Sequence, residues 1–257
     1  MKTQLSKKRP EKHLLRPLKS KAGRNFSGRI TVRHRGGGVK KMYRMVDFGQ
    51  EKLGVKGRIV AFEYDPNRTA YLALVQYEGG DRRYVLAAHN TNVGDEILCA
   101  ADAVVKTGNR VMLKNVPIGT EVFNIELMAG KGGQMVRSAG STAKVMAYEG
   151  KYIHLQMPSK EVRKVGAECF ATIGQASHPE YRFENLHTAG AMRRKGWRPT
   201  VRGSAMNPCD HPHGGGEGRT GIGLKNSKTP WGKPAMGIRT RNRKKWTAKL
   251  IVKRRSK

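Results

Sequence analysis

Residues 57–79 of the chain read GRIVAFEYDPNRTAYLALVQYEG. Two runs rich in β-branched and aromatic residues flank Asp65-Pro66-Asn67, and that trio has the composition of a turn. The order of strand, turn and strand over so short a span predicts antiparallel pairing. The same pattern recurs on both sides of this stretch and decides the fold class.

Nine further short runs extend this pattern, four before and five after residues 103–107. They are separated by turn compositions such as Gly79-Gly80-Asp81, Glu149-Gly150-Lys151 and Pro158-Ser159-Lys160. Many short strands without crossover helices predict antiparallel barrels or sandwiches, and two series predict two small barrels in tandem. The best helix candidate is 177–195. The runs are GRITVRH (28–34), MYRMVDFG (42–49), RRYVLAAH (82–89) and DEILCA (95–100), then NRVMLKNV (109–116), TEVFNIELM (120–128), AKVMAYEG (143–150), KYIHLQM (151–157) and EVRKVGAECFATIG (161–174), besides the two quoted above.

The charge is concentrated at the two ends of the chain. The whole chain has 51 Lys and Arg against 19 Asp and Glu, a net charge of +32 over 257 residues. Residues 1–45 have a net charge of +14, residues 191–257 have +17, and the centre has only +1. Two basic ends beside a near-neutral, apolar-rich centre favour a folded protein that binds a polyanion, above all nucleic acid, and disfavour an ordinary soluble enzyme.

The cysteines and the hydropathy exclude other classes. Cys99, Cys169 and Cys209 are odd in number and widely spaced, which indicates a reducing compartment and no disulfide framework. No apolar run approaches the ~18 residues that span a bilayer, so no membrane partner is expected. The basic start of the chain is compatible with an organellar transit peptide and equally with a tail that binds a partner.

Three loops combine glycine with basic residues. They are Arg33-His34-Arg35 with Gly36–Gly38, Lys131-Gly132-Gly133 with Arg137, and His213 with Gly214–Gly216 and Arg219. Glycine lets backbone N–H groups and flanking cations approach one phosphate closely. Three such loops favour RNA or DNA contact over basic turns in solvent. Trp197, Trp231 and Trp246 lie in the basic C-terminal stretch, where stacking on unpaired bases and packing on the barrel are equally supported.

Three enzyme-like patterns in the C-terminal stretch have little support. GxGxxG at 216–221 lacks the strand and helix of a dinucleotide site, and His213-Gly-Gly-Gly lacks the GxSxG elbow of a hydrolase. Cys209, His211 and His213 leave a metal-dependent hydrolase open as a minor alternative. We expect no catalytic residue, no metal site and no cofactor, apart from structural Mg²⁺ that the RNA itself could hold.

Several strings together resemble the L2 family of ribosomal proteins, from about residue 22 to the C-terminus. They are GSAMNPCDHPHGGGEGR (203–219), EYDPNR (63–68), GRITVRHRGGGVKKMYR (28–44), GKGGQMVRSAG (130–140) and KLIVKRRSK (249–257). The form of the first string is similar to the bacterial or organellar type. The resemblance implies a structural constituent of the large ribosomal subunit.

The fold that the resemblance implies is mostly β: an OB-fold barrel followed by an SH3-like barrel, with long basic extended terminal segments. We expect a basic N-terminal tail at 1–23, an OB-fold RNA-binding domain at 24–104, an SH3-like barrel at 105–190 and a Gly/Pro-rich extension at 191–257. This agrees with the two series of strands and with the segregated charge.

The partners that the resemblance implies are large-subunit ribosomal RNA, other ribosomal proteins and, through an inter-subunit bridge, the small subunit. The protein would support subunit association and the architecture around the peptidyl-transferase centre, in a bacterial-type cytoplasmic ribosome or, alternatively, an organellar one. His211 matches a family histidine discussed as influencing peptidyl transfer, and we interpret it as a structural RNA contact. The expected RNA-binding residues are Arg29, Arg33, His34, Arg35, Arg68, Lys131, Arg137, Arg202, Asn207, His211, His213 and Arg219.

One departure from the family concerns Glu51, which follows Val46-Asp47-Phe48 where relatives commonly have a basic cluster. RNA contact by that turn is therefore not expected. The alternative function from a different class is a free architectural nucleic-acid-binding protein, which would explain the charge but not the density of Gly-His-Arg loops.

Overall fold

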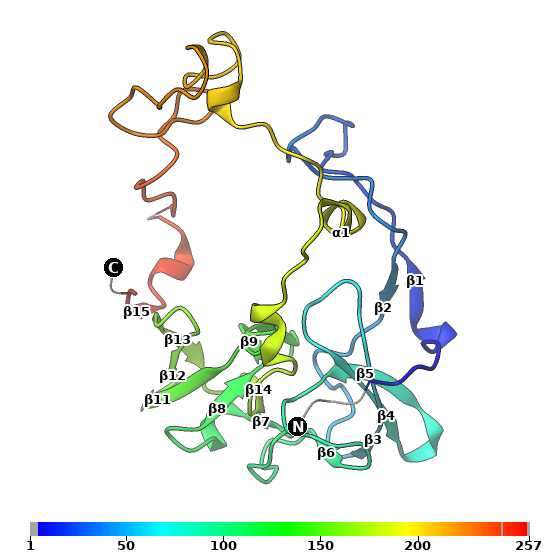
Figure 1. Cartoon of the computed structure of the whole chain (residues 1–257). Coiled ribbons are helices and arrows are strands. Elements are labelled where there is room, and N and C mark those ends of the chain that lie inside the picture. Colours follow the sequence, from blue (N-terminus) through cyan, green and yellow to red (C-terminus); the bar gives the residue numbers. More distant parts are fainter. Residues whose placement is uncertain (1–4, 243, 256–257) are drawn as a thin grey trace. The chain divides into compact units, whose positions relative to one another are not determined.

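The computed structural model describes residues 5–242 and 244–255 and divides into two compact units. The first unit contains the described residues of 1–18, 41–185 and 246–257, and the second contains 19–40 and those of 186–245. The β strands form the first unit, as the ribbon in Figure 1 shows, which confirms the mostly β fold class. The domain boundaries expected above stay predictions.

A four-stranded antiparallel sheet in the first unit contains the stretch that opened the sequence analysis. Its order is β5 (Arg82–Leu86), β4 (Leu72–Tyr77), β3 (Lys56–Glu63) and β6 (Glu96–Leu98). Strands β3 and β4 form the predicted hairpin, with Gly57 opposite Tyr77 and Glu63 opposite Leu72. The turn between them contains Asp65-Pro66-Asn67.

Strand β4 is buried on both faces, which explains its nearly continuous apolar run. Ala73, Val75 and Tyr77 pack into one core cluster, while Leu72 and Leu74 pack into another. The alternation of side chains along a strand separates the two sets. Gly57 on β3 is required by this packing, because an added Cβ would lie 2.5 Å from Val75 Cγ1.

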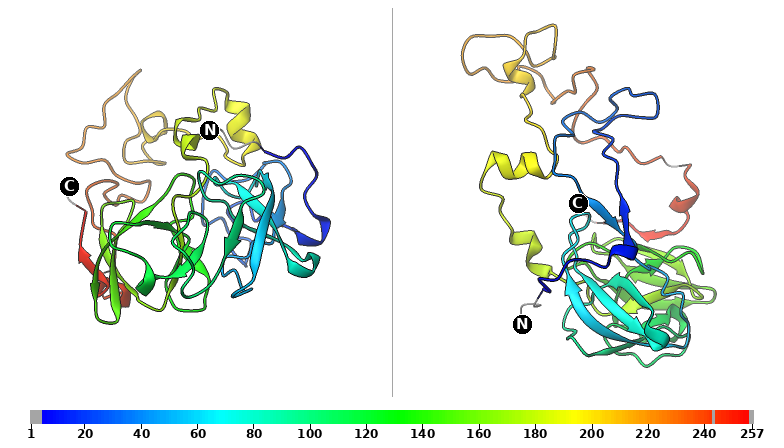
Figure 2. Two further views of the ribbon diagram at one scale, coloured as in Figure 1. Left: turned by 90° about the horizontal axis from the view of Figure 1, so that it is seen from below. Right: turned by 90° about the vertical axis from the view of Figure 1, so that its right-hand side faces the viewer.

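A seven-stranded sheet forms the other part of the first unit (green, with β15 in red, Figures 1 and 2). Leu155 of β12 and Val145 of β11 are fully buried in its core. The turns predicted at 149–151 and 158–160 join β11 to β12 and β12 to β13. In order, the strands are β15 (Ile251–Lys253), β13 (Val162–Gly166), β12 (Tyr152–Gln156), β11 (Ala143–Glu149), β8 (Glu121–Phe123), β14 (Phe170–Ile173) and β7 (Arg110–Met112).

Two pairs of short strands and several 3₁₀ helices complete the first unit. Strand β1 (Leu15–Pro17) pairs with β2 (Met42–Arg44), and β9 (Ile125–Glu126) pairs with β10 (Gly133–Met135). The 3₁₀ helices are Lys12–Leu14, Glu78–Gly80, Leu113–Asn115, Pro179–Phe183 and Trp246–Ala248.

A shared core joins the two main sheets. Phe123 of β8 and Ala176 pack in one cluster with Leu72, Tyr84 and other residues of the four-stranded sheet. The Tyr84 hydroxyl donates to Glu63 Oε2 at 2.8 Å and accepts from the Glu11 amide at 3.1 Å, and burial raises its pKa. The two barrels of the first unit are therefore continuous through apolar contact.

The last described strand, β15, belongs to this first unit although it follows the basic C-terminal stretch. Ile251 lies opposite Arg163 and Lys253 opposite Val162, and the Lys164 amide donates to Leu250 O at 2.8 Å. The chain thus leaves the first unit at 185–186 and returns to it at 245–246. Both ends of the segment 186–245 are therefore attached to the first unit.

The second unit is largely irregular. Its described residues contain the helix α1 (Ala189–Arg194), capped by Thr188, the 3₁₀ helix Gly203–Ala205 and isolated bridges, but no named strand. The strand predicted at 28–34 is therefore wrong. Only Ile30 in that run forms a bridge, with Arg24, and Ile30 and Val32 are each 52% exposed. Alternating aliphatic residues form a stable strand only where a core covers one face.

None of the helices in the described part of the chain combines the length and apolar character that crossing a bilayer requires.

Replacement of Phe123 by alanine tests the shared core. Phe123 is fully buried, so the loss of its ring should lower the free energy of unfolding by about 3–5 kcal/mol in urea denaturation. The matched control is Phe183→Ala, at a ring that is 78% exposed, which should change stability by less than about 0.5 kcal/mol. Equal effects of the two substitutions would contradict a core that spans both sheets.

Candidate nucleic-acid interface

Two of the expected RNA-binding arginines meet at one aromatic ring. The Arg137 guanidinium lies 4.4 Å from the centroid of the Phe48 ring, and the Arg68 guanidinium lies 5.2 Å from it. Arg137 is exposed and Arg68 is half-buried. Cation–π contact holds guanidinium groups flat against a ring and leaves their N–H edges free for an acceptor. We call Phe48, Arg68 and Arg137 the Phe48 cluster.

The turn EYDPNR positions Arg68 through the buried carboxylate of Asp65. Asp65 accepts from the Asn67 amide at 2.9 Å and from Arg68 Nε at 2.5 Å. Arg44 Nη1 lies 3.7 Å from the same carboxylate. Arg44 Nε also lies 4.0 Å from Glu63 Oε2, so two guanidinium groups face two carboxylates of this turn.

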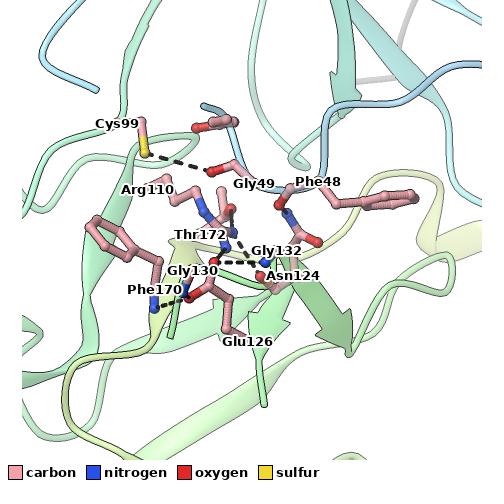
Figure 3. A network of polar contacts seen from close by, with 12 residues as sticks. Phe48, Gly49, Cys99, Arg110, Asn124, Glu126, Gly130, Gly132, Phe170 and Thr172 are labelled. Carbon is pink, nitrogen blue, oxygen red and sulfur yellow. Dashed lines mark hydrogen bonds and ion pairs between the residues drawn. The ribbon is translucent and has the colours of Figure 1, made fainter. Parts of the chain in front are cut away.

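The glycine-rich turn that contains Lys131 lies on a buried ion pair (Figure 3). Arg110 Nη2 donates to Glu126 Oε1 at 2.9 Å, and neither side chain is more than 3% exposed. Glu126 also accepts from the amides of Gly130 and Gly132, each at 3.2 Å, and of Phe170 at 3.1 Å. The carboxylate therefore fixes both glycines that flank the exposed Lys131.

The same network reaches Phe48 from the other side. Arg110 Nη1 donates to Asn124 O at 2.8 Å, and Asn124 Nδ2 donates to Phe48 O at 3.2 Å (Figure 3). The Gly133 amide donates to Phe48 O at 3.1 Å, and Arg137 Nη1 donates to Gly133 O at 3.1 Å. A chain of hydrogen bonds thus runs from the buried pair to the Phe48 cluster.

The turn that contains Glu51 is held by Arg83. This arginine donates to Asp47 at 3.0 Å, to Glu51 at 3.1 Å and to Asp81 at 3.2 Å, and the bond to Asp47 raises its pKa most. Three carboxylates around one guanidinium, with Lys52 Nζ 2.7 Å from Asp81, leave this turn without excess positive charge. A pocket of about 660 Å³ between this turn and Lys131 therefore has walls of mixed charge.

Another expected group lies in the second unit, in residues 29–35. The Arg35 guanidinium lies 3.3 Å from the ring centroid of Trp197, and Arg33 lies 5.3 Å from that of Trp231. His34 Nδ1 lies 3.0 Å from Pro199 O. The exposed Arg29 closes a turn through its amide, which donates to Asn25 Oδ1 at 2.9 Å.

The loop of 202–219 surrounds a buried histidine. His211 is 7% exposed, and its Nδ1 accepts from the His213 amide at 3.0 Å, which places its ring proton on Nε2. His213 Nε2 in turn accepts from the Lys228 amide at 2.9 Å. A Cβ added to Gly203 would lie 2.4 Å from His211 Cε1, so glycine is required there. His211 is therefore held by its own loop.

The remaining residues of this loop differ in exposure and role. Asn207 O accepts from the amides of Asp210 at 3.0 Å and His211 at 3.2 Å, so its backbone shapes the loop. Arg202 and Arg219 are exposed. Within the part of the chain that the structure describes, no three His, Cys, Asp or Glu side chains gather as metal ligands.

The cysteines are free thiols. Cys99 and Cys169 are buried, and burial raises the pKa of each to about 11, so both stay protonated at neutral pH. Cys209 is exposed. Trp231 and Trp246 are 74% and 63% exposed, and Trp197 lies under Arg35.

Taken by unit, the structure brings Arg68, Lys131 and Arg137 together in the first unit. The other expected residues lie in the second unit, in the two groups described above. Sequence reasoning missed Phe48 and the Arg110–Glu126 pair. The position of Phe48, an apolar residue directly after Asp47 in a basic stretch, was the one feature from which its role could have been predicted. Nothing in the sequence around Glu126 indicates its role.

Two family models match the chain. Residues 11–99 match the model described as Ribosomal Proteins L2, RNA binding N-terminal domain. Residues 106–232 match the model described as Ribosomal Proteins L2, C-terminal domain. The first match includes Phe48 and Arg68, and the second includes Glu126, Lys131, Arg137 and His211.

Replacement of Glu126 by glutamine tests the buried pair. The change leaves the Arg110 charge buried without a counter-charge, so the free energy of unfolding should fall by about 3–5 kcal/mol in urea denaturation. Glu121→Gln, at an exposed carboxylate on β8, is the matched control and should change stability by less than about 0.5 kcal/mol. If both variants unfold at the same urea concentration as the parent, the pair does not hold the Lys131 turn.

Proposed function

Because the chain belongs to the ribosomal protein L2 family, we propose that it is a structural constituent of the large ribosomal subunit whose Phe48 cluster binds the subunit's RNA. The family consists of structural RNA-binding proteins and not of enzymes, and its partners are ribosomal RNA and other ribosomal proteins. The protein is thus a component of the ribosome.

The observation that supports this proposal most is the convergence of Arg68 and Arg137 on Phe48. Arg68 lies in the turn between β3 and β4 and Arg137 follows β10, in different motifs, yet both lie against one ring. Lys131 extends from the adjacent turn, which Glu126 fixes. Arg68 Nε and Arg137 Nη1 donate within the protein, and the other N–H groups of these planar cations suit the phosphates and base edges of folded RNA.

The second unit would supply further RNA contacts. RNA phosphates would be contacted by its exposed arginines, which are Arg29, Arg33, Arg35, Arg202 and Arg219. The loops around His34, Asn207 and His213 would approach the RNA backbone closely. His211 would support the architecture around the peptidyl-transferase centre by holding its loop in shape. This structural role is supported by the His213 amide, which donates to His211 Nδ1 within the loop.

Subunit association through an inter-subunit bridge is part of the same proposal, as is a bacterial-type cytoplasmic ribosome, with an organellar ribosome as the alternative. The RNA contacts need no cofactor of the protein's own, and structural Mg²⁺ would be held by RNA phosphates.

Alanine substitutions at Arg68 and Arg137 test the Phe48 cluster. Each should weaken binding to large-subunit RNA and reduce the dependence of log K on log salt by about 0.7–0.9, the effect of one lost phosphate contact. The matched control is Arg58→Ala, at an exposed arginine of β3 outside the cluster. Binding is measured by filter retention across a salt series. If Arg58→Ala weakens RNA binding as much as the other two substitutions, the arginines of the cluster contribute only general positive charge and no specific contact.

Sedimentation of a cell extract through sucrose in high salt separates the ribosomal role from a free architectural role. We expect the chain to sediment with the large-subunit RNA at a one-to-one ratio. Loops that are buried in folded RNA, together with many phosphate contacts, should keep the complex from dissociating in high salt. Its release to the top of the gradient, with the subunits intact, would contradict the proposal and favour a protein that binds nucleic acid loosely.

A further inference from the structure

A pocket of about 400 Å³ lies wholly within the second unit, between residues 22–37 and residues 198–199. Its volume is in the range of pockets that hold small ligands. None of the contacts described for the Phe48 cluster involves it. Part of its lining, Arg33, His34 and Arg35, is the basic loop predicted from the sequence.

Four arginines line this pocket: Arg24, Arg33, Arg35 and Arg198. No carboxylate lines it, and no Asp or Glu occurs between residues 12 and 46 or between residues 185 and 209. The arginines therefore lack a counter-charge from their own segments. Such a group attracts an anion from outside the chain, and guanidinium groups favour phosphate.

Three of these arginines are held by side-chain contacts before any ligand arrives. Arg35 lies against Trp197, Arg33 lies near Trp231, and Arg24 Nη1 donates to Gly28 O at 2.8 Å. The walls are joined by hydrogen bonds from the Arg198 amide to His34 O at 3.1 Å and from the Gly36 amide to Gly196 O at 2.9 Å. The loss of side-chain entropy on binding is correspondingly small.

The floor of the pocket is apolar. Ile30, Val32 and Pro199 line it, and Ile30 and Val32 are each 52% exposed. Half-exposed aliphatic groups beside unpaired arginines are hydrated, and a flat apolar ligand group that covers them would gain free energy. A simple phosphate or a paired duplex would use the arginines but would leave this floor uncovered.

We propose that this pocket binds one unpaired ribonucleotide of an RNA strand, with its base on Ile30, Val32 and Pro199 and its phosphates on the arginines. A nucleotide is the chemical class that offers a planar base and an anion together. The flanking basic segments favour a nucleotide within RNA over a free one. The inference rests on the proposed RNA-binding function and assigns a nucleotide to a part of the chain outside the Phe48 cluster.

The test uses the full chain and two RNA duplexes of equal length, one fully paired and one with a single bulged nucleotide, at one salt concentration. The parent chain should bind the bulged duplex about 10-fold more tightly, as expected for one seated base. Val32→Trp fills the floor without changing the charge and should abolish this preference. The matched control is Val39→Trp, at a 61% exposed valine of the same segment outside the pocket, which should retain it.

A bulged 4-thiouridine, cross-linked by light and mapped by mass spectrometry, gives the location independently, and it should attach to peptides of 22–37 or 198–199. If the parent binds both duplexes tightly and equally, or if the cross-links are confined to other peptides, the assignment of a nucleotide to this pocket is overturned. The RNA-binding function itself would remain supported. Failure to bind either duplex or ribosomal RNA would overturn the proposed function itself. Equally tight binding of free adenosine monophosphate at these peptides would assign the pocket to a free nucleotide and overturn the RNA assignment. If Val32→Trp alters the circular dichroism spectrum, Ile30→Trp replaces it.

Discussion

The buried carboxylate of Glu126 fixes the backbone of the turn that contains Lys131. It neutralises Arg110 inside the protein and accepts three backbone amides, two of which flank Lys131. An ion pair removed from water stabilises a fold only when further hydrogen bonds satisfy the remaining donors and acceptors, and here the amides do so. Because Arg110 also reaches Asn124 and, through it, Phe48, the position of an exposed basic turn depends on a charge that water does not reach.

The two units differ in how they neutralise positive charge. In the first unit, carboxylates such as Asp47, Asp65, Asp81 and Glu149 are paired with lysine or arginine, and Lys52 and Lys164 lower the pKa of Asp81 and Glu149 respectively. The segments of the second unit contain 21 Lys and Arg but only Asp210 and Glu217 as acids. An RNA partner would supply the counter-charge that the second unit lacks, whereas the first unit supplies most of its own.

The sequence predicts the β architecture well, because alternation and turn chemistry are local. The hairpin at 57–79 and the turns at 149–151 and 158–160 follow from neighbouring residues alone. The run at 28–34 has the same local signature, but no core covers Ile30 and Val32, and burial is a long-range property. The candidate site likewise combines local and long-range features. Glycine and basic residues allow its loops to be predicted from the sequence. Glu126 cannot be distinguished from other polar strand residues until its distant partners are known.

The discontinuous make-up of the second unit has a consequence for synthesis of the chain. Residues 34–39 form hydrogen bonds with residues 194–199, so the earlier segment has no partner until some 160 further residues have been translated. Domains generally fold as they emerge, N-terminal parts first, and contacts of such large sequence separation form late. The β strands of the first unit up to β14 are complete before that point, and β15 is added last of all. The most basic part of the protein thus acquires its structure only after the strands up to β14 have been translated, so a folded body can already be present when it forms.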